Sequence, residues 1–390
     1  MTAVIPLNRT GQAFYVPAFE LKVNGRPAGR ETVRDLTEVV YEDSLDAIDS
    51  FTLSFNNWDT DHLRPTFVGE GADEARWADV QPGNGVELWM GYSGDLRLMT
   101  TGYFTALEVE FPESGATLAT VRGLNILDRF RDTQYTWSWP SGNEAPKKDS
   151  EIAEDFGQPP GSPAGHPGLA GITRVVTNAA AKGREQPQDH VFMNNAYPIV
   201  FLMSLARRNG YEVVYQLVDD QPQLYFGPSD QLRDVTYLLE WGKTLTRLKA
   251  TISTSRQVKK MTVLGWNRTT KQAVSGSKTI DEVDVPDTVR ALARATGREE
   301  VVTDHVVSTE AQAQQKAADL LTHNASRLIE VEGTVVGLPD LRAGRNVQLG
   351  RVGPHLSGTY LVTWTKHTIN DSGYRTQFKA RMEGRQAGTT

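Results

Sequence analysis

The sequence predicts an α+β protein that is predominantly antiparallel β, with two similar β-barrel domains that are each associated with a smaller α+β insertion domain. Three observations support this fold class. Short stretches of alternating apolar and polar residues dominate the chain, turns rich in Gly and Pro separate them, and one turn-and-strand pattern occurs twice. The 390 residues allow several packed units, because one domain usually contains about 100–200 residues.

The composition limits the classes of function. Hydrophobic residues make up 39% and charged residues 23%, as in ordinary folded proteins. The net charge of −7 disfavours a duplex-DNA binder, which usually has a basic surface. The chain has no cysteine, which excludes disulfides, thiolate metal sites and cysteine catalysis. No signal-peptide pattern opens the sequence, and no apolar run approaches the roughly 18 residues of a membrane helix. We expect a protein made in the cytoplasm without a membrane partner.

The first barrel is expected to comprise residues 1–136. Residues 19–23 lead into Asn24-Gly25, a pair typical of a two-residue hairpin turn. Residues 51–55 alternate with a period of two, as a half-buried strand does. Further strands are predicted at 86–90, 103–111 and 117–122.

An α+β domain with a Pro- and Gly-rich linker is expected at residues 137–235. Its main helix is predicted at 198–209, because Pro198 suits the first helical position and Gly210 suits the position after the last turn. The other elements predicted here are a short helix and two strands, at 151–156, 212–217 and 223–226.

The second barrel is expected to comprise residues 236–272 and 327–386, interrupted by a helical or α+β insertion at 273–326. The insertion holds the strongest helix signal of the chain, at 310–324, where Thr309 and Gln312 have the spacing of a capping box. Strands are predicted at 250–253, at 260–264 and from residue 328 onward.

One pattern occurs in both predicted barrels. Residues 83–88 and 344–349 both read Gly-x-x-Val-polar-Leu. Each is followed by a Gly-aromatic element, at 102–104 and 358–360, and by a Ser-Gly turn, at 114–115 and 372–373. Glycine is needed where φ is positive or where backbones approach closely, so matching glycines indicate a duplicated domain. Chance similarity between antiparallel turns is the alternative.

The C-terminal part of the sequence resembles a known family. The residues concerned are Gly337-Leu338-Pro339-Asp340-Leu341, Gly344, Gly358-Thr359-Tyr360-Leu361-Val362, His367 and Gly373-Tyr374-Arg375-Thr376. They resemble the C-terminal signature of phage late-control protein D, the tail-hub family of contractile tails, which is similar to the hub half of type VI secretion spike proteins. The resemblance covers about residues 20–384. It departs from the family where Ala196-Tyr197-Pro198 replaces a Ser-Asp-aromatic lead into a helix.

The resemblance implies a structural baseplate hub. Each chain of a homotrimer would supply two barrels, so that a ring of six similar units joins a hexameric inner tube, or a tube-initiator protein, to a trimeric spike. Other baseplate proteins would be further partners, and specific nucleic acid would not. The spike barrel and needle of related proteins do not follow residue 384, so a separate spike protein is expected. The protein would be a component of a phage tail or contractile injection particle.

No catalytic, cofactor-binding or metal-binding residues are predicted. The seven histidines lack the spacing of a zinc site, and neither a Gly-x-Ser-x-Gly elbow nor a phosphate-binding loop is present. His367, which belongs to the family signature, is expected to be a hydrogen-bonded turn or core residue. Asp59 and Asp61 are a fragment of a calcium loop that lacks its glycine and distal glutamate.

Two alternative functions remain open. The acidic residues Glu42, Asp43, Asp46 and Asp49 would suit the carboxylate pair of a tail-associated peptidoglycan hydrolase. A hydrated acidic turn is the simpler interpretation, because nothing nearby indicates an apolar pocket that would raise the pKa of one carboxyl. The chain would otherwise be a glycan- or receptor-binding β module.

Two further groups of residues suit either a structural or a binding role. The basic cluster Arg256, Lys259 and Lys260 is expected to be a solvated strand edge or a docking patch for an acidic partner. Tryptophans suit a barrel core or an interface. Those concerned are Trp58, Trp77, Trp89, Trp137 and Trp139.

Overall fold

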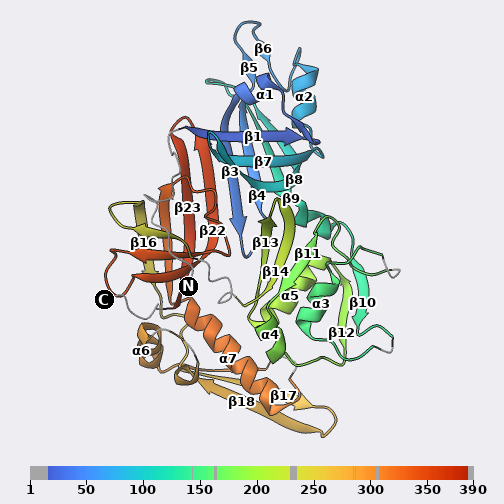
Figure 1. Cartoon of the computed structure of the whole chain (residues 1–390), viewed down its shortest axis with the longest axis vertical. Coiled ribbons are helices and arrows are strands. Elements are labelled where there is room, and N and C mark those ends of the chain that lie inside the picture. The colour runs from blue at the N-terminus through green and yellow to red at the C-terminus, as the bar shows by residue number, and fades with distance from the viewer. Residues whose placement is uncertain are drawn as a thin grey trace.

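One large sheet dominates the fold. The computed structural model describes residues 16–142, 144–161, 165–228, 235–283, 285, 287–303 and 307–384. Thirteen strands form this sheet, and most pair antiparallel, which agrees with the predicted α+β class dominated by β. Figure 1 shows the N-terminal strands at one end of the long axis and a small sheet with helix α7 at the other.

The first run of the large sheet contains six strands in the spatial order β1-β7-β8-β9-β4-β3. Strand β4 alternates between buried and half-buried residues, as predicted for residues 51–55. In the turn after β1, Asn24 and Gly25 have φ of 49° and 76°, the left-handed values that a type I′ turn requires. The strands are β1 (Pro17–Val23), β3 (Leu36–Ser44), β4 (Ser50–Asn56), β7 (Gly85–Tyr92), β8 (Asp95–Glu110) and β9 (Leu118–Asn125).

Small elements decorate the outer end of this run (Figure 1). They are β2 (Arg26–Pro27), α1 (Arg30–Arg34), β5 (Trp58–Asp59), β6 (Arg64–Pro65) and α2 (Glu74–Val80). Asp73 caps the N-terminus of helix α2, and its carboxylate accepts hydrogen bonds from the backbone N–H groups of Ala75 and Arg76.

The second run contains six strands in the order β15-β21-β22-β23-β20-β16. They are β15 (Val235–Glu240), β16 (Leu245–Ile252), β20 (Ile329–Val336), β21 (Asn346–Gly350), β22 (Gly358–Asn370) and β23 (Gly373–Gly384). Strand β22 also pairs antiparallel with β3, and this pairing makes one continuous sheet of the two runs. Within the described residues, no pairing joins β1 to β3 or β15 to β16. Backbone hydrogen bonds between strands therefore do not close either run into a barrel.

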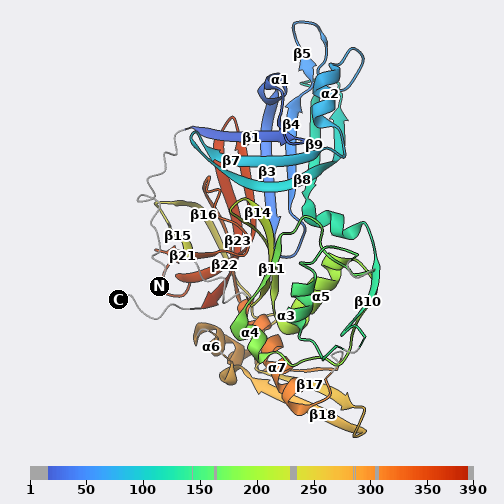
Figure 2. The same ribbon diagram turned by 45° about the vertical axis from the view of Figure 1, so that its right-hand side comes forward.

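The first insertion follows β9 and has its own core. Figure 2 shows α3 and α5 between β11 and β10. Helix α5 has the predicted bounds, and Gly210 follows it with a left-handed φ of 69°. The core also takes in Leu127 and Phe130, which precede the expected start of this domain at residue 137. The elements are the 3₁₀ helix Ile126–Arg131, β10 (Tyr135–Trp139), α3 (Asp149–Asp155), β11 (Arg174–Thr177), α4 (Ala179–Arg184), β12 (Val191–Ala196), α5 (Pro198–Asn209), β13 (Glu212–Val218) and β14 (Gln221–Gly227).

The second insertion is a three-stranded sheet with two helices. The predicted capping box opens α7, where Thr309 and Gln312 exchange hydrogen bonds between side chain and backbone. Strands β17 and β18, on either side of the expected boundary at residue 272, pair with each other. The elements are β17 (Lys260–Asn267), β18 (Gln272–Thr279), the 3₁₀ helix Ile280–Glu282, α6 (Asp287–Thr296), β19 (Glu299–Val302) and α7 (Glu310–Ser326).

The two runs share a β-bulge at the same place in their outer strands. The pairing of β3 with β4 shifts between Leu36 and Glu38, and that of β16 with β20 shifts between Leu245 and Arg247. A threonine lies at each shift. Thr37 donates a hydrogen bond from Oγ1 to the Ser54 carbonyl (3.0 Å), and Thr246 donates to the Thr334 carbonyl (2.8 Å). The bulges therefore match in position, in residue type and in hydrogen bond.

A second bulge is also repeated. It lies at Thr105, where β8 pairs with β9, and at Thr363, where β22 pairs with β23. Thr105 donates from Oγ1 to the Arg122 carbonyl (3.2 Å), and Thr363 donates to the Lys379 carbonyl (3.3 Å). Because bulges re-aim a strand at a defined point, two matching bulges in one strand order are specific shared features.

The turns before β7 and β21 match as well. Gly83 and Gly344 have φ of 95° and 82°, and their N–H groups donate to the carbonyls of Phe104 (2.7 Å) and Val362 (2.8 Å). The sequence comparison was wrong at one point. The strand register aligns Gly102 with Tyr360, because these residues oppose the equivalent valines of β7 and β21, and Gly358 lies two residues earlier.

Substitution of the two equivalent glycines is expected to have unequal effects. A Cβ at Gly344 would lie 2.5 Å from Cγ1 of Val214, whereas a Cβ at Gly83 meets nothing within 4 Å. The left-handed φ costs about 1–2 kcal/mol in both variants. Overpacking adds about 1–3 kcal/mol for Gly344→Ala alone. Urea unfolding of the two variants measures the difference, and equal losses of stability would contradict this account.

Candidate functional site

The two runs meet at a buried polar cluster centred on Arg342, which lies in the loop between β20 and β21. The guanidinium donates from Nε to Oδ2 of Asp43 (2.6 Å), and from Nη2 to the Met99 carbonyl (2.9 Å) and the Tyr41 hydroxyl. Its Cζ lies 4.7 Å from the centroid of the Tyr41 ring. Arg342 thus belongs to the second half of the chain but takes all these partners from the first run.

Asp43 accepts hydrogen bonds from three residues of the second half. Besides Arg342, its donors are the Ala343 N–H (3.2 Å) and the Thr365 hydroxyl. Only 5% of Asp43 is exposed. A carboxylate this deeply buried requires a cation and several hydrogen bonds, and the loop after β20 supplies most of them.

The acidic residues of the sequence do not form one site. Glu42 pairs with Lys366 (2.9 Å) beside the sheet junction, and Asp46 is exposed. Asp49 is buried and accepts a hydrogen bond from the Tyr41 hydroxyl (3.0 Å). The expectation that nothing nearby raises a carboxyl pKa was wrong. Burial, and then the charge of Asp43, raise the pKa of Asp49 to about 7.

This burial also limits the chemistry of the carboxyl pair. Asp43 and Asp49 are 5% and 6% exposed, and their oxygens bond to neighbouring side chains and backbone. A glycosidase needs two carboxyls on either side of a substrate bond. Buried in this way, Asp43 and Asp49 give a polysaccharide no access, and Asp43 joins the two runs.

His367 lies fully buried in the same cluster. Its Nε2 is 3.0 Å from the Leu341 carbonyl, and its Nδ1 is 3.0 Å from the Tyr374 hydroxyl and 3.1 Å from Oγ1 of Thr376. Since a carbonyl only accepts, we assign the proton to Nε2 and an acceptor role to Nδ1. Burial lowers the pKa of His367 to about 4. This geometry is that of a hydrogen-bonded core histidine.

Other residues of the family signature hold the same loop. The Gly337 carbonyl accepts from the Tyr92 hydroxyl (3.0 Å), and a Cβ at Gly337 would overlap the Tyr374 ring. The Leu338 N–H donates to Oγ1 of Thr376 (2.9 Å). The signature therefore marks the residues that seat the loop after β20 between the two runs. The sequence analysis identified these residues but not Arg342, which lies between the signature residues Leu341 and Gly344 without being one of them.

The calcium-loop fragment forms a local turn. Asp59 accepts hydrogen bonds from the N–H groups of Asp61 and His62, and its Oδ2 lies 2.8 Å from Nδ1 of His62. The hydrogen bond with the His62 side chain lowers the pKa of Asp59. In the described part of the chain, no group of three or more His, Asp and Glu side chains is placed to hold a metal ion.

The basic cluster and the tryptophans have mixed environments. Arg256 and Lys259 are exposed, and Lys260 begins β17. Trp139 is buried in the first insertion, where it stacks on Phe201 with ring centroids 5.5 Å apart. The remaining tryptophans of the set are partly exposed, at 36% for both Trp58 and Trp77 and to an intermediate degree for Trp89 and Trp137.

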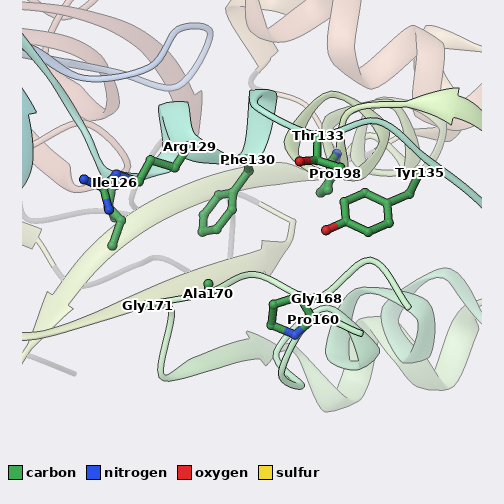
Figure 3. Close-up of a pocket in the computed structure, with 10 residues that line it drawn as sticks. All are labelled: Ile126, Arg129, Phe130, Thr133, Tyr135, Pro160, Gly168, Ala170, Gly171 and Pro198. Carbon is green, nitrogen blue, oxygen red and sulfur yellow. The ribbon is translucent and has the colours of Figure 1, made fainter. Parts of the chain in front are cut away.

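A pocket of about 300 Å³ lies in the first insertion (Figure 3). Arg129 is the charged residue among the described residues of its wall, and its guanidinium lies 4.9 Å from the centroid of the Tyr103 ring. None of the lining residues that the structure describes is a carboxylate or a histidine. The lining residues are Ile126, Arg129, Phe130, Thr133, Tyr135, Pro160, Gly168, Ala170, Gly171 and Pro198. None of the helices in the described residues has the length and apolarity needed to cross a membrane.

Comparisons with solved structures identify the fold. A 43 kDa tail protein of the Shewanella oneidensis prophage MuSo2 is similar over 94% of this chain and 98% of its own, with a TM-score of 0.66 and 16% identity. A tail protein of Neisseria meningitidis is similar over 95% and 97%, with a TM-score of 0.65 and 13% identity. The chain has the fold of a phage tail protein. The resemblance to the tail-hub family is confirmed at the level of the fold.

A third structure extends this phage-tail fold to secretion systems. The Escherichia coli c3393 protein is described as a type VI secretion component similar to the T4 phage tail proteins gp27 and gp5. It is similar over 92% of this chain and 76% of its own, with a TM-score of 0.54 and 11% identity.

The sequence comparisons add little to the structural ones. A family model described as the Alg8 N-terminal domain matches residues 179–371, just under half of the chain. That range ends between β22 and β23, which pair with each other, so it does not follow a folding unit. No curated protein matched the sequence.

Loss of the Arg342 cation is expected to destabilise the tail-protein fold strongly. Arg342→Met would leave Asp43 buried without its charge partner, which typically costs about 3–5 kcal/mol. Arg345→Met is the matched control, because Arg345 is exposed and lies three residues away; a change within about 0.5 kcal/mol is expected there. Urea unfolding followed by circular dichroism measures both. Similar losses in the two variants would show that the cluster does not join the runs.

His367 is expected to make stability depend on pH. Its folded pKa of about 4 lies below the ordinary 6.5, so its contribution is present above pH 6.5 and is lost as pH falls through 4. The stability difference between wild type and His367→Gln should therefore shrink by about 3 kcal/mol from pH 7 to pH 4. Asp49 acts with the opposite sign, because its raised pKa stabilises the fold at low pH, and it cancels in this comparison.

Tyr374→Phe is the control for this pH dependence. It removes a hydrogen bond to the same ring but keeps His367 in place. The variant should retain the wild-type pH dependence in urea unfolding between pH 4 and pH 7. A His367→Gln difference that stays constant over this range would contradict the buried neutral histidine.

Proposed function

We propose that this chain is the structural hub of a contractile tail or injection particle, where it joins the inner tube to the central spike as a homotrimer. One observation carries the proposal. The chain has the fold of phage tail proteins, and within that fold two six-stranded runs repeat the same strand order, the same two threonine bulges and the same glycine turn.

The repetition has a mechanical meaning in such a particle. We infer that the two runs are two similar barrels, so that a trimer presents six similar units. A six-fold tube could then contact one face of the ring and a three-fold spike the other. Closed rings form from head-to-tail interfaces when the rotation closes. The doubled run resolves the mismatch between the two symmetries without a second gene product.

The sheet pairings support a revised division into domains. We propose that the first barrel ends at residue 125 and that the first insertion covers 126–228, because Leu127 and Phe130 lie in the insertion core. The second insertion would begin at residue 260, because β17 pairs with β18 and β19 but not with the large sheet. The second barrel then comprises 235–252 and 329–384.

The proposed partners are a separate trimeric spike, a hexameric inner tube or tube-initiator protein and other baseplate proteins. We propose no specific nucleic acid, no cofactor and no enzymatic activity. The net charge of −7 suits a hub that does not retain passing polyanions. Of the four acidic candidates, Asp43 and Asp49 are buried, Glu42 pairs with Lys366 and Asp46 is exposed. They do not form one carboxylate site, which makes peptidoglycan cleavage the weaker alternative. No observation on the described residues favours a glycan-binding module.

Electron microscopy of the assembled particle tests this function. Three copies of the chain are expected between tube and spike, and a copy number that is not a multiple of three would contradict the proposal. A peptidoglycan-release assay with purified chain tests the alternative. Release that is abolished by Asp46→Asn would support a hydrolase, whereas no release is expected from a hub.

A further inference from the structure

Among the described strands, the pairing of β3 with β22 has no counterpart within the chain. In the strand order of the two runs, β16 corresponds to β3, and β8 corresponds to β22. Strand β16 ends the large sheet and forms its ladder with β20 alone among the described strands. From Ala106 onward, β8 forms its ladder only with β9 in the same part of the chain. Two strand edges that should pair, by analogy with β3 and β22, are therefore both open.

The matching bulges align the residues of the open edges, on β8 and β16, with those of the observed junction between β22 and β3. Alignment of Thr105 with Thr363 places residues 107–110 on 365–368. Alignment of Thr37 with Thr246 places residues 249–252 on 40–43. The observed register of β22 on β3 then predicts the register of β8 on β16. The opposed pairs would be Leu107 with Ile252, Glu108 with Thr251, Val109 with Ala250 and Glu110 with Lys249.

The side chains of the two open edges are complementary. On one face, the half-buried Leu107 and Val109 would oppose Ile252 and Ala250, and Ile252 is 50% exposed in the single chain. On the other face, Glu110 would oppose Lys249 directly. Apolar and oppositely charged cross-strand pairs stabilise a ladder by roughly 0.2–1 kcal/mol each.

The charges continue beyond the opposed pair. Glu108 lies on the same face of β8 as Glu110, and Arg247 lies on the same face of β16 as Lys249, since residues two apart in a strand share a face. An acidic edge would therefore meet a basic edge. The equivalent junction inside the chain also has an opposed ion pair, between Lys366 and Glu42 at 2.9 Å.

We propose that β16 of one copy pairs antiparallel with residues 107–110 of β8 in a second copy, in this register. The inference rests on the proposed hub and names the surface by which its copies meet. Such pairing would repeat the β3–β22 junction between chains. It would also cover two sheet edges that are otherwise open to aggregation. Because the two edges belong to different runs, each copy binds one neighbour on either side and the assembly can close into a ring.

Disulfide trapping tests the register, because the chain contains no cysteine of its own. The double variant Val109→Cys, Ala250→Cys is oxidised as purified full-length chain and separated on non-reducing gels. Opposed residues of an antiparallel pair have Cα atoms about 4.5 or 5.5 Å apart, and both distances suit a disulfide. Species of two and three chain masses are expected. A mixture of the two single variants should give cross-linked species of no more than two chain masses.

Two matched controls define the result. Val109→Cys with Thr251→Cys shifts the register by one residue and places the thiols on opposite faces, so little cross-linking is expected. Glu42→Cys with Lys366→Cys opposes two thiols across the junction inside one chain. These thiols should form an intrachain disulfide, so free thiols are lost while the protein still migrates at one chain mass. The charge exchange Glu110→Lys should reduce trapping by the opposed cysteines, and adding Lys249→Glu should restore it.

The outcomes distinguish failure of the proposed β8–β16 pairing from failure of the proposed hub function. Because trapping accumulates transient contacts, contacts as weak as about 1 mM in Kd are detected at matching concentrations. The pairing would be overturned if the chain were found solely as a monomer at such concentrations. It would also be overturned if the shifted register were trapped equally well. A native trimer that resists trapping would overturn the pairing and leave the hub intact. A cross-linked series beyond three chains would support the pairing but contradict the closed trimer.

Discussion

The fold depends on the antiparallel pairing of β3 with β22, which joins two runs of strands that are about 300 residues apart in sequence. Backbone hydrogen bonds alone would leave this junction open to slippage. The buried carboxylate of Asp43 fixes it, because its donors Arg342, Ala343 and Thr365 all come from the other run. A slip of one residue would turn Asp43 to the opposite face and leave both charges unpaired.

The loop after β20 explains why a family signature gathers around a site without chemistry. Its backbone bonds to Tyr92 and Thr376, its Leu341 carbonyl meets His367, and its Arg342 binds the first run. Each of these residues satisfies a polar group that burial would otherwise leave unpaired. A signature of glycine, histidine, tyrosine and threonine can therefore arise from assembly geometry as readily as from catalysis, and the buried environment of His367 distinguishes the two.

The first insertion contacts both runs of the large sheet. Glu212 pairs with Arg381 of the second run (2.6 Å), and the Tyr215 hydroxyl lies 3.3 Å from that of Thr101 in the first run. The Lys316 ammonium of helix α7 donates to the Arg208 carbonyl (2.5 Å), which ties the second insertion to the first. The first insertion thus contacts both runs, and the second insertion contacts the first.

The sequence by itself determined the local structure: the alternation in β4, the Asn24-Gly25 turn, the bounds of α5 and the capping box of α7 all follow from short-range rules. It missed α6, although Val289, Leu292, Ala293 and Thr296 have helical spacing. Only the tertiary structure decided which strands pair, how Gly102 aligns with Tyr360, and that Asp43 and Asp49 are buried whereas Asp46 is exposed. The physical reason is the distance along the sequence over which each feature is determined. Periodicity and turns are encoded within a few residues, whereas desolvation and strand register depend on partners hundreds of residues away.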